Sequence, residues 1–377
     1  MAQTENKKVF NVGVIGYGMS AKIFHIPFIS TTPNLTLHSI LQRNPGPSSS
    51  APLDHPRIKH FTSLSPFLSD PALDVVILCT TPDTHFPLAT QALEAGKHVF
   101  VEKPFVPTST EADRLISLAS ARGLHLCVYQ NRRWDSDFLT LRTLLSTGRL
   151  GRIVEIDTHF DRYRPTKPDP KAWKASLPLS SGGTALYDLG THLVDQIYVL
   201  FGLPRSVFAK LVNQRDGVSL SPSTSSPDVF IPDSVDMQLF YDGGLTVHVR
   251  IGVHSAEVRQ PRFWVRGTKG SFRKTGLDPQ EDQLKAGMKT TDDKFGFEPE
   301  DFYGRLVTVG DDGSMTEEVY PTVEPATYAK IYELFGKSLS GEGPVPVPAS
   351  EARDVLRVLE AARESALTRR EVELAST

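Results

Sequence analysis

The sequence predicts a two-domain α/β protein: a doubly wound parallel sheet, followed by an α+β domain with an open-faced, mostly antiparallel sheet. The chain has 377 residues, roughly two to three times the length of a typical single domain. Short apolar runs alternate with helix-like segments up to about residue 130, and glycine-linked runs of alternating polarity follow. We therefore expect domains at residues 1–130 and 131–377.

In the first domain, strands are expected where a short run is wholly apolar, as in VVIL at 75–78, and helices where apolar residues recur on one face. Residues 44–56 are rich in proline and serine and are expected to form a loop. The strands are expected at 9–15, 35–41, 74–80, 98–101 and 124–129, and the helices at 21–30, 65–69, 87–95 and 109–121. This alternation requires crossover connections, and hence a parallel sheet covered on both faces.

The second domain is expected to be a sheet with helices on one face. Asp242-Gly243-Gly244 is a suitable hairpin connection between two of its strands. The strands are expected at 151–160, 207–212, 235–241, 245–251, 262–266 and 271–274, and the helices at 135–146, 183–201 and about 350–368. Residues 214–234 and 276–301 are long for connecting loops, so each is either mobile or functional.

Composition excludes several classes of protein. Lys and Arg number 41 and Asp and Glu 44, and this near-balance argues against coating nucleic acid or an anionic membrane. Two cysteines, Cys79 and Cys127, are too few for a disulfide scaffold or a multi-cysteine zinc site, and we expect no metal. No secretory leader or membrane-spanning run is visible, so we expect a cytoplasmic protein.

The segment Gly16-x-Gly18-x-x-Ala21 follows a predicted strand and opens a predicted helix. In a Rossmann domain the first glycine permits a tight turn, the second lets the backbone approach a pyrophosphate, and the third position must be small. The helix N-terminus then offers N–H groups to the phosphates. The alternative is that these glycines only end a strand. We expect a dinucleotide site, with contacts from Gly16, Tyr17, Gly18, Met19 and Ser20.

The end of the second strand discriminates between the two nicotinamide cofactors. NAD sites usually place an acidic residue there to bind the ribose hydroxyls, whereas this chain has Arg43 and no acid. A guanidinium suits a 2′-phosphate, so we favour NADP over NAD, the alternative being a solvated loop cation. Further cofactor contacts are expected at the end of a later strand, from Thr80, Thr81, Pro82 and His85, although His85 is equally well explained as a helix-start histidine without a ligand.

Three segments resemble the glucose–fructose oxidoreductase/inositol dehydrogenase/rhizopine catabolism (Gfo/Idh/MocA) family. They are AGKHVFVEKP at 95–104, NRRWD at 131–135 and GGTALYDLGTHLVD at 182–195. The last two most resemble a branch of NADP-preferring enzymes that includes NADP-dependent scyllo-inositol dehydrogenases. The resemblance implies catalysis at the junction of a nucleotide-binding domain and an open-faced sheet domain, with the last helix packing back on the first. Asp83 and Ala21 depart from the usual family residues without removing a catalytic group.

The chemistry is expected to rest on three residues. In the family, the lysine at the position of Lys103 contacts the nicotinamide side and the reacting oxygen, and Glu102 is assigned with it to the cofactor site. Asp188 and His192 lie four apart on one predicted helix, so both project from one face. We expect His192 to be the general acid or base, because an imidazole titrates near neutral pH, and Asp188 to orient the substrate. Taken alone, Asp188 and His192 would be explained as ordinary polar residues on the surface of a helix.

The substrate is expected to be a polyol, a cyclitol or a sugar, bound also by Arg132, Tyr163 and Trp173, although each of these three has an equally good packing explanation. The alternative function is a non-catalytic regulator that binds NADP and a partner protein. An open-faced sheet is rarely left exposed, and relatives commonly associate through it, so we expect a homodimer or homotetramer.

Overall fold

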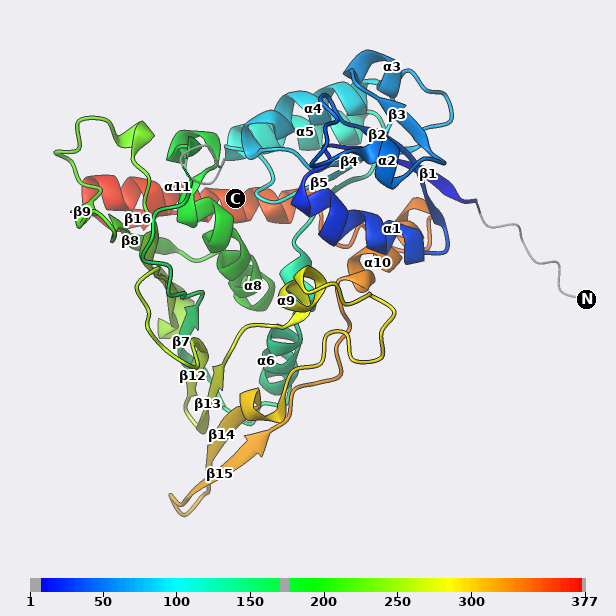
Figure 1. The fold of residues 1–377 in the computed structure, drawn as a ribbon. Helices are drawn as coiled ribbons and strands as arrows, with labels where there is room; N and C mark the ends of the chain where they lie inside the picture. Colours follow the sequence, from blue (N-terminus) through cyan, green and yellow to red (C-terminus); the bar gives the residue numbers. More distant parts are fainter. Residues whose placement is uncertain (1–7, 170–175, 375–377) are drawn as a thin grey trace, which may run out of the picture.

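The computed structural model describes residues 8–169 and 176–374, which build two sheets with helices between and around them (Figure 1). The two-sheet α/β architecture predicted above is confirmed. Among the described residues, every helix is too short or too polar to cross a membrane.

The first sheet is six-stranded and parallel throughout, in the order β3-β2-β1-β4-β5-β6. Its strands are β1 (Phe10–Ile15), β2 (Leu35–Leu41), β3 (Lys59–Phe61), β4 (Val75–Leu78), β5 (His98–Val101) and β6 (Leu126–Val128). Its helices are η1 (Ala21–His25, a π-helical turn), α1 (Ile26–Thr31), α2 (Ala51–Asp54), α3 (Leu64–Leu68), α4 (Pro82–Glu94) and α5 (Ser109–Ala121). Helices α4 and α5 cover one face, while α1 covers the other beside α10 (Ala329–Leu339) (Figure 1).

The second sheet has ten strands, with the path β15-β14-β13-β12-β7-β11-β10-β8-β16 and β9 paired to β8. All its pairings are antiparallel except that of β7 with β11. The strands are β7 (Ile153–His159), β8 (Ser206–Asn213), β9 (Val218–Ser219), β10 (Ser234–Phe240), β11 (Thr246–Ile251), β12 (Pro261–Gly267), β13 (Gly270–Thr275), β14 (Gly304–Val309), β15 (Met315–Tyr320) and β16 (Val372–Glu373).

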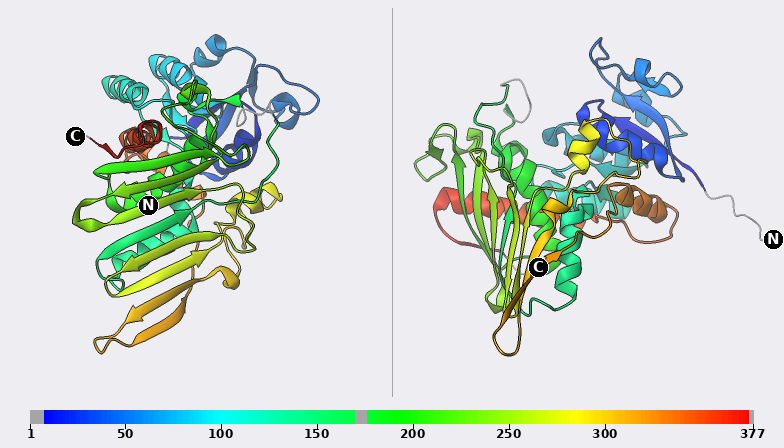
Figure 2. Two further views of the ribbon diagram at one scale, coloured as in Figure 1. Left: turned by 90° about the vertical axis from the view of Figure 1, so that its left-hand side faces the viewer. Right: turned by 60° about the horizontal axis from the view of Figure 1, so that its bottom comes forward.

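Helices cover only one face of this sheet, and the other face is open (Figure 2, left). The main helices are α6 (Ser136–Ser146), η4 (Leu186–Gly190, a π-helical turn), α8 (Thr191–Phe201), α9 (Gln280–Lys285) and α11 (Ala349–Thr368). The 3₁₀ turns are η2 (Asn131–Trp134), η3 (Leu179–Ser181), η5 (Pro227–Val229), η6 (Asp242–Gly244) and η7 (Glu300–Phe302). The expected hairpin at 242–244 joins β10 to β11.

Several elements differ from the sequence-based expectation. Helix α4 begins at Pro82, five residues earlier than expected, because proline is well tolerated in the first helical turn. The expected loop at 44–56 contains the short helix α2. Strands β3, β9 and β14 to β16 and helices α9 and α10 were not predicted. Strand β15 illustrates why, because nearly all of its side chains are exposed and so leave no alternation to read.

The C-terminal helices return to the first sheet. The ring of Phe335 on α10 lies 4.9 Å from the ring of Phe100 on β5. On α11, the Glu360 carboxylate accepts hydrogen bonds from the backbone N–H and the hydroxyl of Ser109, at 2.7 and 2.6 Å. These contacts join the C-terminal helices to the first sheet, and one of the cavities described next is lined by residues from both halves of the chain.

Candidate functional site

The loop at residues 16–20 exposes Gly18 and Met19 at its tip, as a dinucleotide site requires. Gly16 has a φ of +94°, and a Cβ atom there would lie 2.5 Å from the carbonyl oxygen of Cys79, so only glycine fits this turn. A Cβ atom on Gly18 would have no neighbour within 4 Å. The space beside Gly18 and the following turn of η1 therefore fit a pyrophosphate group.

Two cavities flank this loop, and both are lined by Gly18, Cys79, Thr80 and Thr81. We name them by one lining residue each. The Arg43 cavity, of about 720 Å³, extends towards the ends of β2 and β3. The Lys103 cavity, of about 460 Å³, extends towards η4 and α8 of the second half. The shared wall allows a single extended ligand to occupy both.

The Arg43 cavity has no acidic residue among its described lining residues. Arg43 itself forms no ion pair within the described chain, and it shares the wall with Thr62 and Ser63. These two hydroxyl residues follow β3 and were missed in the sequence, because a three-residue strand gives no readable pattern. Tyr17 also lines this cavity, and its hydroxyl donates a 2.7 Å hydrogen bond to Asp54.

The Lys103 cavity brings together the three residues expected to carry the chemistry. Lys103 follows β5, Asp188 lies on η4 and His192 lies on α8. The Lys103 Nζ atom donates to Oδ1 of Asp188 at 2.8 Å and to its backbone carbonyl at 2.9 Å. Met19, Ser20 and Pro82 also line this cavity. A cation, a carboxylate and an imidazole therefore face the space next to the glycine loop.

Glu102 also lines the Lys103 cavity, but its carboxylate is engaged by the protein. It accepts hydrogen bonds from the Ser20 hydroxyl and from the backbone N–H of Lys103, and lies 3.1 Å from Nε2 of His25. Burial raises the pKa of Glu102, but the neighbouring His25 and Lys103 outweigh burial and hold the pKa below its usual value. Glu102 thus fixes the start of η1 relative to Lys103.

Phe160 supports three polar side chains at the far end of the Lys103 cavity. The His192 ring lies 6.4 Å from the Phe160 ring at an angle of 26°. The guanidinium groups of Arg132 and Arg162 lie 4.9 and 4.6 Å from the Phe160 centroid. Arg132 is also paired with Asp135 and Glu281, so it is held on both sides.

The structure does not bring every expected residue to these cavities. His85 is fully buried and lines neither, because its ring nitrogens contact the backbone oxygens of Thr80, Pro104 and Phe105 at 3.0 to 3.1 Å. Burial lowers the pKa of this imidazole, which suits a neutral structural residue. The cofactor contact expected of His85 is therefore withdrawn.

One of the expected substrate residues, Tyr163, also falls outside the Lys103 cavity. Tyr163 is 60% exposed and lines a neighbouring cavity of about 720 Å³, which shares only Arg162, Asp188 and Leu189 with the Lys103 cavity. We call it the Tyr163 cavity. Trp173 lies outside the described residues. Arg132 does line the Lys103 cavity, together with Asn131, Phe160, Arg162 and Glu281, of which the last three were missed in the sequence.

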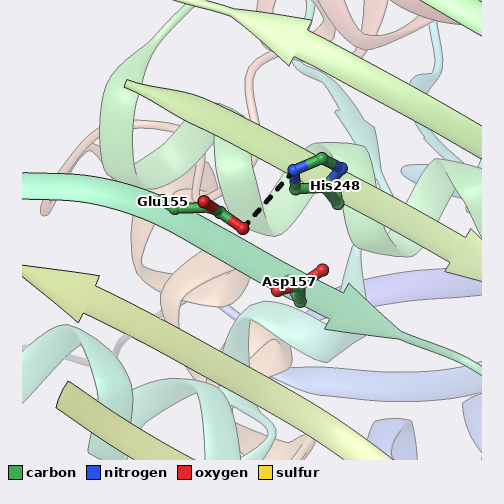
Figure 3. A group of neighbouring side chains, drawn as sticks. All are labelled: Glu155, Asp157 and His248. Atoms are coloured by element: carbon green, nitrogen blue, oxygen red, sulfur yellow. Dashed lines mark ion pairs between the residues drawn. The ribbon is translucent and has the colours of Figure 1, made fainter. Parts of the chain in front are cut away.

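A separate polar cluster lies on the open face of the second sheet (Figure 3). Glu155, Asp157 and His248 offer ligand atoms within 4.8 Å of one another, and Glu155 lies 3.6 Å from Nε2 of His248. Arg266 pairs with Glu155, and Arg250 lies 3.9 Å from Asp157. Because the two arginines already balance both carboxylates, we assign no metal to this cluster.

Comparisons with known proteins extend over both halves of the chain. Models of the Gfo/Idh/MocA family match as "Oxidoreductase family, NAD-binding Rossmann fold" at residues 10–130 and "Oxidoreductase family, C-terminal alpha/beta domain" at residues 142–374. The uncharacterized oxidoreductase YdgJ of Escherichia coli is 39% identical over 355 residues, which cover 94% of this chain and 96% of YdgJ.

Two further relatives show the same extent of similarity. The scyllo-inositol 2-dehydrogenase (NADP(+)) IolW of Bacillus subtilis is 33% identical over 363 residues, covering 96% of this chain and 95% of IolW. The crystal structure of an oxidoreductase from Bacillus cereus is similar with a TM-score of 0.85 and 30% identity, covering 98% of this chain and 99% of that one. The sequence and fold similarities therefore agree over the whole length.

Proposed function

The chain belongs to the Gfo/Idh/MocA family of oxidoreductases, and from this we propose that it transfers a hydride between NADP and a secondary alcohol or carbonyl group of a polyol, cyclitol or sugar. It is thus an enzyme with a nicotinamide-binding Rossmann domain, and no observation favours the non-catalytic alternative. The proposal is carried by one observation: Lys103, Asp188 and His192 line one cavity that opens onto the glycine loop.

Each of the three residues has a distinct role in this proposal. When bound, the nicotinamide ring supplies or accepts the hydride. Lys103 places a cation next to the reacting oxygen and stabilises negative charge that develops there. His192 takes up or returns the hydroxyl proton, its ring oriented by Phe160. Asp188 holds the Lys103 ammonium at 2.8 Å and accepts a hydrogen bond from a substrate hydroxyl.

NADP is proposed over NAD because of the charge in the Arg43 cavity. A carboxylate that binds the ribose hydroxyls of NAD would repel a 2′-phosphate, and no acidic residue is among the described lining residues. Arg43, Thr62 and Ser63 instead offer a guanidinium and two hydroxyls on the same wall. The name of the relative IolW, which is NADP-linked, supports the same choice.

To test the proposed function, the purified protein is incubated with NADP or NAD and a panel of inositols, alditols and aldoses. Formation of the reduced cofactor is measured by its absorbance. The cyclitol arm is included because IolW is named for scyllo-inositol. We expect turnover of at least one polyhydroxy compound, with higher kcat/KM for NADP than for NAD. Absence of turnover with both cofactors over the whole panel, in either direction, would refute the proposal.

We further propose that the open face of the second sheet is covered by a second copy of the chain. The strand register places one side chain of each main strand in a row across this face: Phe208, Gln238, His248, Asp157, Trp264, Arg273, Arg305 and Val319. Trp264 lies between the guanidinium groups of Arg266 and Arg273, at 4.5 and 4.4 Å. Light scattering of the protein and of a Phe208→Asp variant tests this: the wild type should be a dimer or tetramer and the variant smaller.

A further inference from the structure

Arg162 occupies a position that the reaction itself does not explain. It follows β7, and its guanidinium lies 4.6 Å from the centroid of the Phe160 ring. It is one of three residues that line both the Lys103 cavity and the Tyr163 cavity, so it lies where the two cavities adjoin, a place that we call the passage. A ligand whose reacting carbon lies near Lys103 and whose other end extends towards the Tyr163 cavity would lie beside this guanidinium.

The carboxylates that line these two cavities already have partners other than Arg162. They are satisfied in the following contacts: Asp188 by Lys103, Glu281 by Arg132, Asp216 by Lys167, Asp233 by Arg215, and Glu102 by Ser20 and His25. In the described part of the chain, neither Arg162 nor Arg164 forms an ion pair or donates a side-chain hydrogen bond. Two guanidinium groups therefore remain without a counter-ion along the passage.

The surroundings of Arg162 make it unfavourable for its guanidinium to lack a counter-ion. Burial lowers the pKa of its guanidinium, and the nearby Arg164 lowers it further, which outweighs the attraction of Glu281 and Asp188. A half-buried cation without a partner costs free energy, and a ligand anion that pairs with it recovers that cost. A guanidinium also offers two parallel N–H donors, the geometry that suits a carboxylate or a phosphate.

We propose, on the basis of the function proposed above, that the polyhydroxy substrate carries an anionic group, a carboxylate or a phosphate, which Arg162 and Arg164 bind at the passage into the Tyr163 cavity. Arg162 thereby selects a charged sugar or cyclitol derivative over its neutral parent. The glycine-loop residues Gly18, Met19 and Ser20 do not line the Tyr163 cavity, so the proposed anion subsite is separate from the loop expected to hold the cofactor phosphates.

The test compares matched series of substrates. Glucose is compared with glucuronate and glucose 6-phosphate, and myo-inositol with inositol 1-phosphate, by NADP-linked kcat/KM and by calorimetric binding to the protein loaded with NADP. The variants are Arg162→Gln and Arg164→Gln, with Arg142→Gln, an exposed arginine of α6 that lines none of the three cavities, as the control. The glucuronate and phosphate arms separate the two sources of negative charge.

We expect at least one charged compound to be preferred over its neutral parent by about 10-fold or more, which corresponds to about 1.4 kcal/mol. Arg162→Gln should remove this preference by lowering kcat/KM for the charged compound much more than for the neutral parent. Arg164→Gln should weaken the preference less, and Arg142→Gln should leave it unchanged. If kcat/KM for the neutral parent equals that for its charged derivatives, the inference is overturned but the proposed function stands.

Two further outcomes separate the inference from the proposed function. Arg162-dependent binding of an anion without any turnover supports the anion subsite and counts against the proposed reaction. If no charged compound binds the NADP-loaded protein, or if Arg162→Gln weakens NADP binding by the same factor as substrate binding, the anion subsite is overturned. Equal weakening of NADP and substrate binding would mean that Arg162 binds the cofactor.

Discussion

The ammonium group of Lys103 lies 2.8 Å from a carboxylate oxygen of Asp188, and the two residues come from opposite halves of the fold. The ion pair is largely buried, with 17% of the lysine and 12% of the aspartate side chain exposed. It thus fixes the first sheet to the helix layer of the second at the point where the reaction is proposed to occur. The chemistry depends on this junction, and the predictions below probe it and its surroundings.

The first prediction concerns Lys103. Lys103→Met keeps an unbranched side chain, one atom shorter, but removes the charge. It should lower kcat by about 10²- to 10⁴-fold, the range of a positioned proton-transfer or charge-stabilising group. NADP binding, measured by fluorescence titration, should change much less. Lys289→Met, at an exposed lysine that lines none of the three cavities, is the control and should behave as wild type. Retained turnover in Lys103→Met would contradict the assigned role.

A second prediction separates two glycines of the same loop. Gly16→Ala should destabilise the protein by about 1–3 kcal/mol, because its positive φ and the Cys79 carbonyl at 2.5 Å both exclude a Cβ atom. Gly18→Ala should leave the free energy of unfolding nearly unchanged, since its Cβ atom would meet open space, and should weaken cofactor binding. Thermal unfolding and NADP titration measure the two effects. Equal loss of stability in both variants would contradict this reading of the loop.

Cofactor choice gives the third prediction. Arg43→Ala should weaken NADP binding by roughly 10- to 100-fold, the value of a charge-assisted hydrogen bond to the 2′-phosphate. NAD binding should stay within about twofold, because NAD lacks that phosphate. Arg57→Ala, an exposed arginine that does not line the Arg43 cavity, serves as the control. If Arg43→Ala weakens NAD binding as much as NADP binding, Arg43 does not recognise the 2′-phosphate.

The fourth prediction follows the pH dependence of Glu281. Burial raises its pKa, but Arg132 and Lys285 outweigh burial and lower it from 4.5 to about 2. A carboxyl with a lowered pKa stabilises the native state fully above pH 4.5, and this stability is lost as the pH falls towards 2. Glu281→Gln should therefore cost at most about 3 kcal/mol at neutral pH, and the difference from wild type should shrink below about pH 4.5.

Urea unfolding of both proteins from about pH 3 to about pH 7 measures this difference. The exposed Glu317→Gln on β15 is the matched control and should show no such pH dependence. A Glu281→Gln difference that stays constant over the whole range would mean that Glu281 acts through its shape and not through its charge.

The sequence predicted best those site residues that sit in local motifs. Gly16, Gly18 and Lys103 each lie at the end of a strongly apolar strand, where the carboxyl edge of a parallel sheet brings them together. Asp188 and His192 line one cavity, as the sequence predicted. The prediction assumed a regular α-helix, whereas Asp188 lies in a π-helical turn that precedes α8. The domain boundary near residue 130 and the assigned roles stay predictions.

The residues that were missed depend on tertiary contacts. Arg162 lies beyond the last residue of β7, and Glu281 lies on a six-residue helix inside a charged segment without periodicity, so neither has a local signal. The error at His85 has a related cause. A Thr-Pro turn predicts where its backbone lies, whereas only the packing of Pro104 and Phe105 determines that the ring points inward.

Helix α10 has a consequence for how the chain is made. It packs on the first sheet through Phe335 against Phe100, and its Tyr332 hydroxyl lies 2.6 Å from the buried His25 ring. Residues 329–339, about two hundred residues beyond the end of the N-terminal half, therefore bury part of the apolar surface of its sheet. On the ribosome, the cofactor-binding half should emerge early yet stay incompletely buried until α10 follows, and a fragment cut near residue 130 should aggregate.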